Sequence, residues 1–310
     1  MITLALNNFY FKDKLKKDIH VYKWTPEDTK IKGVVQIAHG MAEHAGRYND
    51  FASFLNENGY IVYADDHRGH GKTSPNELGY MGEGDVFHLM VDNLKELTDI
   101  IKKENPELPV FLLGHSMGSF ISLRYSELYG SELKALILSG SNGKQNLKFS
   151  FGALVAKMEM KNKGPKAPAT LMDKLSFGNF NSKFKPNRTN SDWLTRDTKE
   201  VDKYLEDTMC GTIHSTSYFY HLLRGLKNNY KHENLSEIPP NLPILLVAGK
   251  KDPVGLMGQG VKRLQNSLRD AGIKQVDMKL YDDARHEILN EVNKEEVYDD
   301  ILAFLDRNQK

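Results

Sequence analysis

Short runs of apolar residues recur along the chain, and polar segments with helical spacing separate them. Six runs have strand character: 34–39, 60–65, 110–114, 135–140, 244–249 and 276–281. Apolar residues follow one another in these runs without strict alternation, which is typical of strands that are covered on both faces in a mostly parallel sheet. The pattern therefore predicts a sheet with a helix layer on each side.

The segments between the first runs have the spacing of amphipathic helices. Apolar residues recur every three or four positions near 51–55, 91–101 and 121–128, and Gly59 and Gly130 follow the first and last of these. Alternation of strand and helix is the signature of an α/β fold. The opening segments FYFKD and IHVYKW, with charged residues between them, instead predict an antiparallel hairpin at the sheet edge.

The alternation stops in one long segment, 142–236. Glycine and proline interrupt it, it contains no buried strand pattern, and helical patterns cover 192–209 and 214–227. Strand character resumes after Pro243, and amphipathic patterns at 260–271 and 291–307 predict the closing helices. We therefore expect a core formed by 1–141 and 237–310, with 142–236 inserted as a helical cap.

Composition excludes several classes of protein. The 310 residues carry 42 basic and 41 acidic side chains, a net charge of +1, so the chain lacks the basic excess that nucleic-acid binding requires. A single cysteine, Cys210, provides neither a disulfide nor a Cys-x-x-Cys pair for zinc or redox chemistry. The start of the sequence lacks a signal-peptide pattern, and no apolar run approaches the roughly 20 residues that span a bilayer. These features predict a cytoplasmic protein.

The charge is nevertheless uneven along the chain. Residues 144–188 contain ten Lys or Arg and two Asp or Glu, which gives 10 − 2 = +8. Apolar residues such as Phe151 and Met158 alternate there with lysines such as Lys157 and Lys161, a mixture typical of interfacial segments. One hypothesis is peripheral docking on anionic membranes; the other is a solvated basic rim above a helix that faces the core.

The sequence GHSMG, residues 114–118, follows an apolar run and precedes a helical pattern. Strand, turn and helix in this order are the context of a G-x-S-x-G nucleophile elbow, in which flanking glycines allow close packing around a strained serine. We therefore expect Ser116 to be a nucleophile.

A serine hydroxyl requires a base to remove its proton and a carboxylate to orient that base. Asp252 and His286 each follow a predicted strand, at the carboxyl edge where open sheets bind ligands. Their order after Ser116 is the order of this fold class. Three other carboxylates lie beside His286 in the sequence, but adjacency does not give the geometry of an orienting acid: Asp282, Asp283 and Glu287.

The sequence HGMAEHAGRY supplies a turn after the first buried strand, and the amide of Met41 could join that of Met117 as an oxyanion hole. We expect His39 to support this turn rather than to titrate. The segment DHRGHGKT, 66–73, lacks a ligand set at zinc spacing and is predicted to be a buried polar loop that braces the turn. His214 and His221 are predicted to share a helix face rather than to bind a metal.

Together, HGMAEHAGRY, DHRGHGKT, GHSMG, GKKDPVG and ARHEILNE resemble the monoacylglycerol lipase and lysophospholipase group of α/β-hydrolases, also described as the serine aminopeptidase S33 type. The resemblance runs nearly end to end and includes RTNSDWLTRD and DTMCG of the insertion. It implies the α/β-hydrolase fold, Ser116, Asp252 and His286 as the triad, Met41 and Met117 as the oxyanion hole, and no cofactor or metal. It also implies that Cys210 lines the acyl pocket; by itself, the residue is typical of a small buried hydrophobe.

The resemblance implies a serine hydrolase that cleaves monoacylglycerol-like or lysophospholipid-like esters through an acyl-enzyme. Two alternatives remain open. The same site could act on small soluble esters or thioesters, with the cap as a gate. In a different class, a ligand-sensing protein could keep the triad and turn over little substrate.

Overall fold

The computed structural model describes residues 5–27 and 29–309 and contains one nine-stranded sheet. Its strand order is β1-β3-β5-β4-β6-β7-β8-β9, with β2 also paired to β3. Strands β4 to β9 are parallel to one another. Strands β1, β2 and β5 each pair with β3 in antiparallel fashion. The pairing of β2 with β3 confirms the predicted hairpin at this edge of the sheet. The strands are β1 (Ala5–Leu6), β2 (Phe9–Lys12), β3 (Asp18–Thr25), β4 (Gly33–Ala38), β5 (Tyr60–Asp65), β6 (Val110–His115), β7 (Ala135–Ser139), β8 (Ile244–Gly249) and β9 (Val276–Tyr281).

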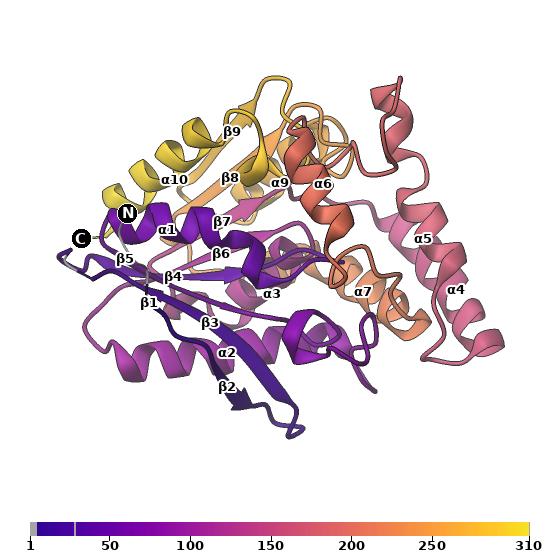
Figure 1. Cartoon of the computed structure of the whole chain (residues 1–310), viewed down its shortest axis with the longest axis horizontal. Helices are drawn as coiled ribbons and strands as arrows, with labels where there is room; N and C mark the ends of the chain where they lie inside the picture. The colour runs from indigo at the N-terminus through magenta and orange to yellow at the C-terminus, as the bar shows by residue number, and fades with distance from the viewer. Residues whose placement is uncertain (1–4, 28, 310) are drawn as a thin grey trace.

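Helices cover both faces of the sheet, which explains the absence of strict alternation in the strand sequences (Figure 1). In β4, Val34 belongs to the core beneath one helix layer and Val35 to the core beneath the other. Successive strand side chains point to opposite faces, so both must be apolar when both faces are buried. The covering helices are α1 (Asn49–Glu57), α2 (Val86–Glu104), α3 (Met117–Tyr129), α9 (Gln259–Asp270) and α10 (Lys294–Asn308).

Between β7 and β8 the chain forms further helices, which lie together at one end of the molecule (Figure 1). Helix α7 links them to the core, because it packs against α2 and α3 on one side and α4 on the other. None of the described helices is both long and apolar enough to cross a membrane. The helices are α4 (Asn146–Lys163), α5 (Thr170–Phe177), α6 (Thr198–Glu206), α7 (Thr216–Asn229) and α8 (His232–Leu235).

The sequence pattern located the helices of this segment incompletely. The pattern at 214–227 corresponds to α7, but only the middle of 192–209 is an α-helix, as α6. Helices α4 and α5 lie within 144–188, where the sequence suggested a helix in one of two hypotheses but gave no bounds for it. Apolar residues of α4 occur both on the side packed against α7 and on the exposed side, so the sequence has no single apolar stripe.

Candidate active site

The GHSMG segment forms a sharp turn between β6 and α3. Ser116 has φ 50° and ψ −115°, a backbone conformation that costs energy in a residue with a side chain. A Cβ atom at Gly118 would lie 2.0 Å from the Ala38 carbonyl oxygen, and one at Gly114 would lie 2.4 Å from the Gly118 oxygen. Only glycine permits this approach of β4, β6 and α3, and the turn is the elbow geometry that the motif predicts.

His286 and Asp252 meet beside this elbow. His286 Nδ1 lies 3.0 Å from Asp252 Oδ2, and both side chains are buried. The other carboxylate oxygen of Asp252 accepts a hydrogen bond of 2.8 Å from the Val254 amide, which fixes its orientation. Burial disfavours the imidazolium, but the Asp252 carboxylate, with smaller contributions from Glu287 and Glu43, outweighs burial and raises the pKa of His286 above its ordinary value. Such a pair can accept a proton from a hydroxyl and stabilise the resulting charge.

Ser116 and His286 come together at the end of β7. The Ser116 amide donates a 2.9 Å hydrogen bond to the Ser139 carbonyl. At the next residue, Gly140, a Cβ atom would lie 3.1 Å from Cε1 of His286. Ser116 and His286 also line the same cavity. The structure therefore brings the three predicted residues Ser116, Asp252 and His286 to one corner of the sheet.

The turn after β4 leaves one amide available at this corner. The Gly40 amide donates to Glu43 Oε1 at 2.6 Å, and the Ala42 amide donates to His70 Nε2 at 3.4 Å. Between them, the Met41 amide has no hydrogen-bond acceptor among the described residues. Met117 is the first residue of α3, so its amide has no acceptor within the helix. Two backbone donors are thus present beside Ser116, where an oxyanion would require them.

Buried histidines support the turn from below. His39 Nδ1 donates to the Gly40 carbonyl at 2.7 Å, and Nε2 accepts from the His67 amide at 2.9 Å. Burial lowers the pKa of His39 and of His70, so both rings remain neutral and act as hydrogen-bond supports. These contacts are those expected of His39 and of the 66–73 loop.

His214 and His221 do not share a helix face as predicted. His214 precedes α7, and its Nε2 lies 2.8 Å from Nε2 of His70, so it joins the buried support instead. His221 lies within α7, 3.8 Å from Asp85. The seven-residue spacing was misleading because α7 begins only after Ser215 supplies its N-terminal cap.

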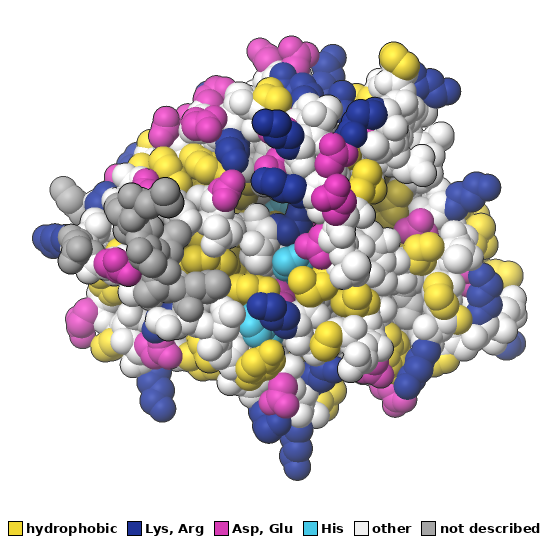
Figure 2. Space-filling view, viewed as in Figure 1, with side chains coloured by type: hydrophobic (Ala, Val, Ile, Leu, Met, Phe, Trp, Pro, Cys, Tyr) yellow, Lys and Arg dark blue, Asp and Glu magenta, His cyan; other side chains and the backbone are white. Residues whose placement is uncertain are grey.

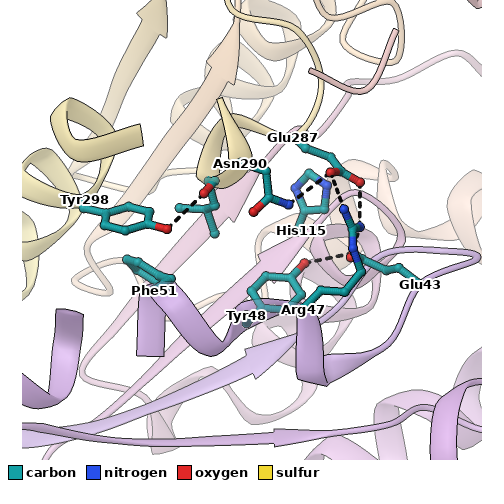
Figure 3. Close-up of a pocket in the computed structure, with 9 residues that line it drawn as sticks. Glu43, Arg47, Tyr48, Phe51, His115, Glu287, Asn290 and Tyr298 are labelled. Carbon is teal, nitrogen blue, oxygen red and sulfur yellow. Dashed lines mark hydrogen bonds and ion pairs between the residues drawn. The ribbon is translucent and has the colours of Figure 1, made fainter. Parts of the chain in front are cut away.

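An ion-pair cluster beside the elbow was not predicted from the sequence (Figure 3). Arg47 donates to Glu43 at 2.8 Å and to both carboxylate oxygens of Glu287 at 2.7 Å. Burial opposes ionisation of the Glu287 carboxylate, but the attraction to Arg47 is stronger and lowers the pKa of Glu287 to about 2. The cluster ties the turn after β4 to the residue after His286. Glu43 and Arg47 belong to the HGMAEHAGRY segment, but nothing in that segment indicated that Arg47 would pair with Glu287, 240 residues away.

A cavity of about 850 Å³ opens from this corner into the helices between β7 and β8. Ser116, His286, Met41 and Met117 line its inner end. Cys210 also lines it and is half-buried, as the resemblance implied, rather than sealed in a core. Many of the remaining lining residues are apolar side chains of α4, α5 and α7, among them Phe149, Val155, Met172, Phe177, Phe219 and Leu222.

Trp193 is a further lining residue that sequence reasoning did not single out. Its ring centre lies 5.1 Å from that of His286, and it packs against Phe177 and Phe180. The tryptophan thus connects the imidazole to the apolar wall formed by α5 and the following turn.

Comparison with known families agrees with this geometry. Residues 29–293 match the family described as serine aminopeptidase, S33. The chain belongs to this family of α/β-hydrolases. The S33 match includes the elbow, the Asp252–His286 pair and the helical segment between β7 and β8.

Two relatives and one solved structure place the chain within the S33 family more closely. It is 30% identical to a monoacylglycerol lipase of Mycolicibacterium smegmatis over 283 residues, which cover 91% of this chain and 90% of that protein. It is 28% identical to mouse monoglyceride lipase over 276 residues, covering 87% and 80%. A thermostable carboxyl esterase from Bacillus coagulans, solved in complex with glycerol, superimposes with a TM-score of 0.91 and 30% identity, covering 99% and 100%.

Proposed function

We propose that this protein is a serine hydrolase that cleaves carboxylic esters of lipids, of the monoacylglycerol or lysophospholipid type. Ser116 is the nucleophile, His286 the general base and Asp252 the carboxylate that orients it. The Met41 and Met117 amides form the oxyanion hole, and no cofactor takes part. The strained elbow, the 3.0 Å contact of Asp252 with His286 and the family relationship support these roles.

The reaction divides into two transfers of the acyl group. His286 accepts the Ser116 proton through Nε2, since Nδ1 faces Asp252, while Ser116 Oγ bonds to the ester carbonyl carbon. Collapse of the tetrahedral intermediate releases the alcohol, which takes the proton from the imidazolium and leaves the acyl group on Ser116. Water then attacks this acyl-enzyme with His286 again as base, and the fatty acid departs as the serine recovers its proton.

The cavity is the observation that carries the lipid assignment. Its volume of about 850 Å³ is near the upper end of the range for small-molecule sites, and much of its wall is apolar. Polar residues gather where Glu43, Tyr204 and Glu287 line it, close to Arg47. A single-chain ester matches this division, with its alcohol at the polar end and its acyl chain among the apolar side chains of the insertion. In this proposal, residues 142–236 form a cap over the core of 1–141 and 237–310.

Probe labelling and acyl-length profiling test the proposal together. A fluorophosphonate should label Ser116 in the wild type and fail to label Ser116→Ala, whereas Ser131→Ala, a change at an exposed serine, should label normally. Hydrolysis of monoacylglycerols should fall by on the order of 10⁶ in Ser116→Ala. The rate should also rise from acetyl to palmitoyl esters. A steep preference for acetyl would favour the small-ester or thioester function instead.

A ligand-sensing function would give a different kinetic result. The probe would still label Ser116, but an acyl-enzyme burst would be followed by negligible turnover. Sustained turnover of long-chain esters would exclude it. The two measurements therefore separate the proposed hydrolase from both alternatives.

We further propose that the insertion docks peripherally on anionic membranes through α4 and α5. Large apolar side chains of these helices are exposed, including Leu147 at 89%, Phe151 at 67% and Leu154 at 56%. In Figure 2, yellow hydrophobic side chains alternate with dark blue Lys and Arg on the side where Figure 1 has these helices. Neighbouring exposed lysines include Lys157 and Lys161. Apolar residues flanked by cations suit the interface of an anionic bilayer.

The same surface continues into the cavity. Phe151 and Leu175 are both exposed and both line it, so they connect the outer apolar surface with the inner wall. A lipid that leaves a membrane beside α4 would therefore pass over apolar side chains on its way to Ser116, without crossing water.

Vesicle co-sedimentation tests the docking. The double variant Leu154→Ser/Met158→Ser changes exposed residues that do not line the cavity. It should bind anionic vesicles more weakly and hydrolyse soluble short esters at the normal rate. Leu128→Ser, at an exposed leucine of α3, is the matched control and should bind normally. Binding that ignores both anionic lipid and salt would contradict the docking.

A further inference from the structure

A second cluster of chemically reactive side chains lies beside the cavity, outside the proposed triad. His44, Asp207 and Cys210 each offer one donor atom, and the three atoms lie within 4.8 Å of one another. His44 Nε2 and Asp207 Oδ2 are already 2.7 Å apart. Imidazole, carboxylate and thiolate together are a ligand set that zinc uses, with bonds of about 2.0–2.3 Å.

Charged side chains surround Cys210. The Arg47 guanidinium and the carboxylates of Asp207, Glu43 and Glu287 all act on its sulfur electrostatically. Arg47 already pairs with Glu43 and Glu287, so the carboxylate that could bind a cation beside the thiol is that of Asp207. Because Cys210 also lines the cavity, a cation and a water or hydroxide as fourth ligand could reach the cluster from there.

The cluster joins two parts of the molecule. His44 belongs to the turn after β4, three residues beyond Met41, whereas Asp207 and Cys210 follow α6 in the insertion. Two other contacts join the same parts: the Gly211 amide donates to the Ala42 carbonyl at 2.9 Å, and Arg47 stacks on the Tyr204 ring at 5.0 Å. A metal held here would fasten the insertion to the turn that carries the Met41 amide.

We infer that His44, Asp207 and Cys210 bind a borderline-soft divalent cation, for which Zn²⁺ is the best match. We also infer that the bound cation inhibits ester hydrolysis. On binding, the thiol releases its proton to solvent and the Cys210 sulfur bonds to the metal. The His44 proton moves to Nδ1 so that Nε2 can bind, and the 3.2 Å hydrogen bond from the Gly46 amide is given up. The inhibition rests on the proposed function, but the binding does not.

Cobalt gives a direct spectroscopic test, because Cys210 is the only cysteine in the sequence. Purified protein titrated with Co²⁺ should develop a thiolate-to-cobalt charge-transfer band, and Zn²⁺ should displace it. The variants Asp207→Asn and His44→Gln should each weaken Zn²⁺ binding by at least about 100-fold, since even changes behind a ligand cost 10–100-fold. His88→Ala removes a half-buried histidine that also pairs with an aspartate, at 3.0 Å, and this variant should bind Zn²⁺ normally.

Two results would overturn the site: no charge-transfer band with Co²⁺, or a band that Asp207→Asn and His44→Gln leave unchanged. Inhibition is measured separately, with each variant compared with its own metal-free rate. Zn²⁺ should slow the wild type and His88→Ala but not Cys210→Ser. Equal inhibition of Cys210→Ser would overturn the inhibitory role. If the chain hydrolysed no ester at all, the cobalt spectrum would still decide the site.

Discussion

The corner around Ser116 and the exposed side of α4 and α5 are built in opposite ways. At the corner, the polar side chains are buried, and hydrogen bonds or ion pairs hold them, as with Arg47 between Glu43 and Glu287. On α4, apolar side chains such as Phe151 are exposed to solvent, with exposed lysines such as Lys157 nearby. One region is fixed in position, and the other is adaptable.

This difference matches the roles that we propose for the two regions. Stabilising charge in a transition state requires donors that are already in place, because reorganising them would raise the barrier. Receiving a lipid requires a surface that tolerates different neighbours, and scattered apolar and cationic groups do this without exact geometry. Small changes at the corner should therefore have large effects, whereas changes on α4 should have graded ones.

After the loss expected for Ser116→Ala, the largest effect is expected from Asp252→Asn. The amide cannot hold the His286 tautomer or stabilise its imidazolium, so kcat should fall by on the order of 10⁴ with little change in KM. Steady-state hydrolysis of a monoacylglycerol measures both. Asp283→Asn, which changes a carboxylate near His286 in the sequence, is the control and should keep its activity. A similar loss in both variants would contradict the role of Asp252.

Close packing at the elbow predicts the next largest effect. Gly118→Ala would push a methyl group to 2.0 Å from the Ala38 oxygen, and neither backbone can yield easily. The free energy of unfolding should fall by about 3 kcal/mol or more, as measured by denaturant titration. On the side of α4 that faces the cavity, the methyl group of Gly152→Ala would instead meet the flexible end of the Leu223 side chain at 3.1 Å. It should stabilise the protein by up to about 1 kcal/mol through helix propensity. Equal losses at both sites would remove the contrast.

A smaller and graded effect is expected from the lysines of α4. Each cation near an anionic bilayer contributes about 1 kcal/mol, so Lys157→Gln/Lys161→Gln should weaken vesicle binding by about 30-fold at low salt. High salt should reduce the difference between this variant and the wild type. Lys134→Gln, outside α4 and α5, serves as the control. Unchanged vesicle affinity of the double variant would argue for a solvated rim.

The smallest effect concerns the pH profile. His286 must be neutral to act as base, and its raised pKa places the acidic limb of kcat/KM above pH 6.5. The Glu287 carboxylate contributes to this increase, so Glu287→Gln should lower the pKa of His286 and move the acidic limb to lower pH. Asp282→Asn, an exposed carboxylate, should leave the limb in place. Movement to higher pH in Glu287→Gln would contradict the electrostatic account.

Much of the fold could be predicted from the sequence, because its signals are local. Continuous apolar runs indicated strands buried on both faces, and glycines at 114 and 118 indicated a turn in which backbones meet. The order of Ser116, Asp252 and His286 at strand ends was enough to select them as candidates. In each case the physical requirement falls on a residue and its immediate neighbours, so it leaves a trace in the sequence.

Other features were decided only in three dimensions. The ion pair of Arg47 with Glu287 and the cluster of His44 with Cys210 join distant segments, and either partner alone looks like an ordinary polar residue. The bounds of helix α4 could not be predicted because its apolar residues lie on two sides, one against α7 and one toward solvent. The sequence by itself determined which segments form the buried strands and which residues are candidates for the chemistry. Tertiary structure decided which charges meet and which apolar groups stay exposed, because both depend on packing between segments that share no local pattern.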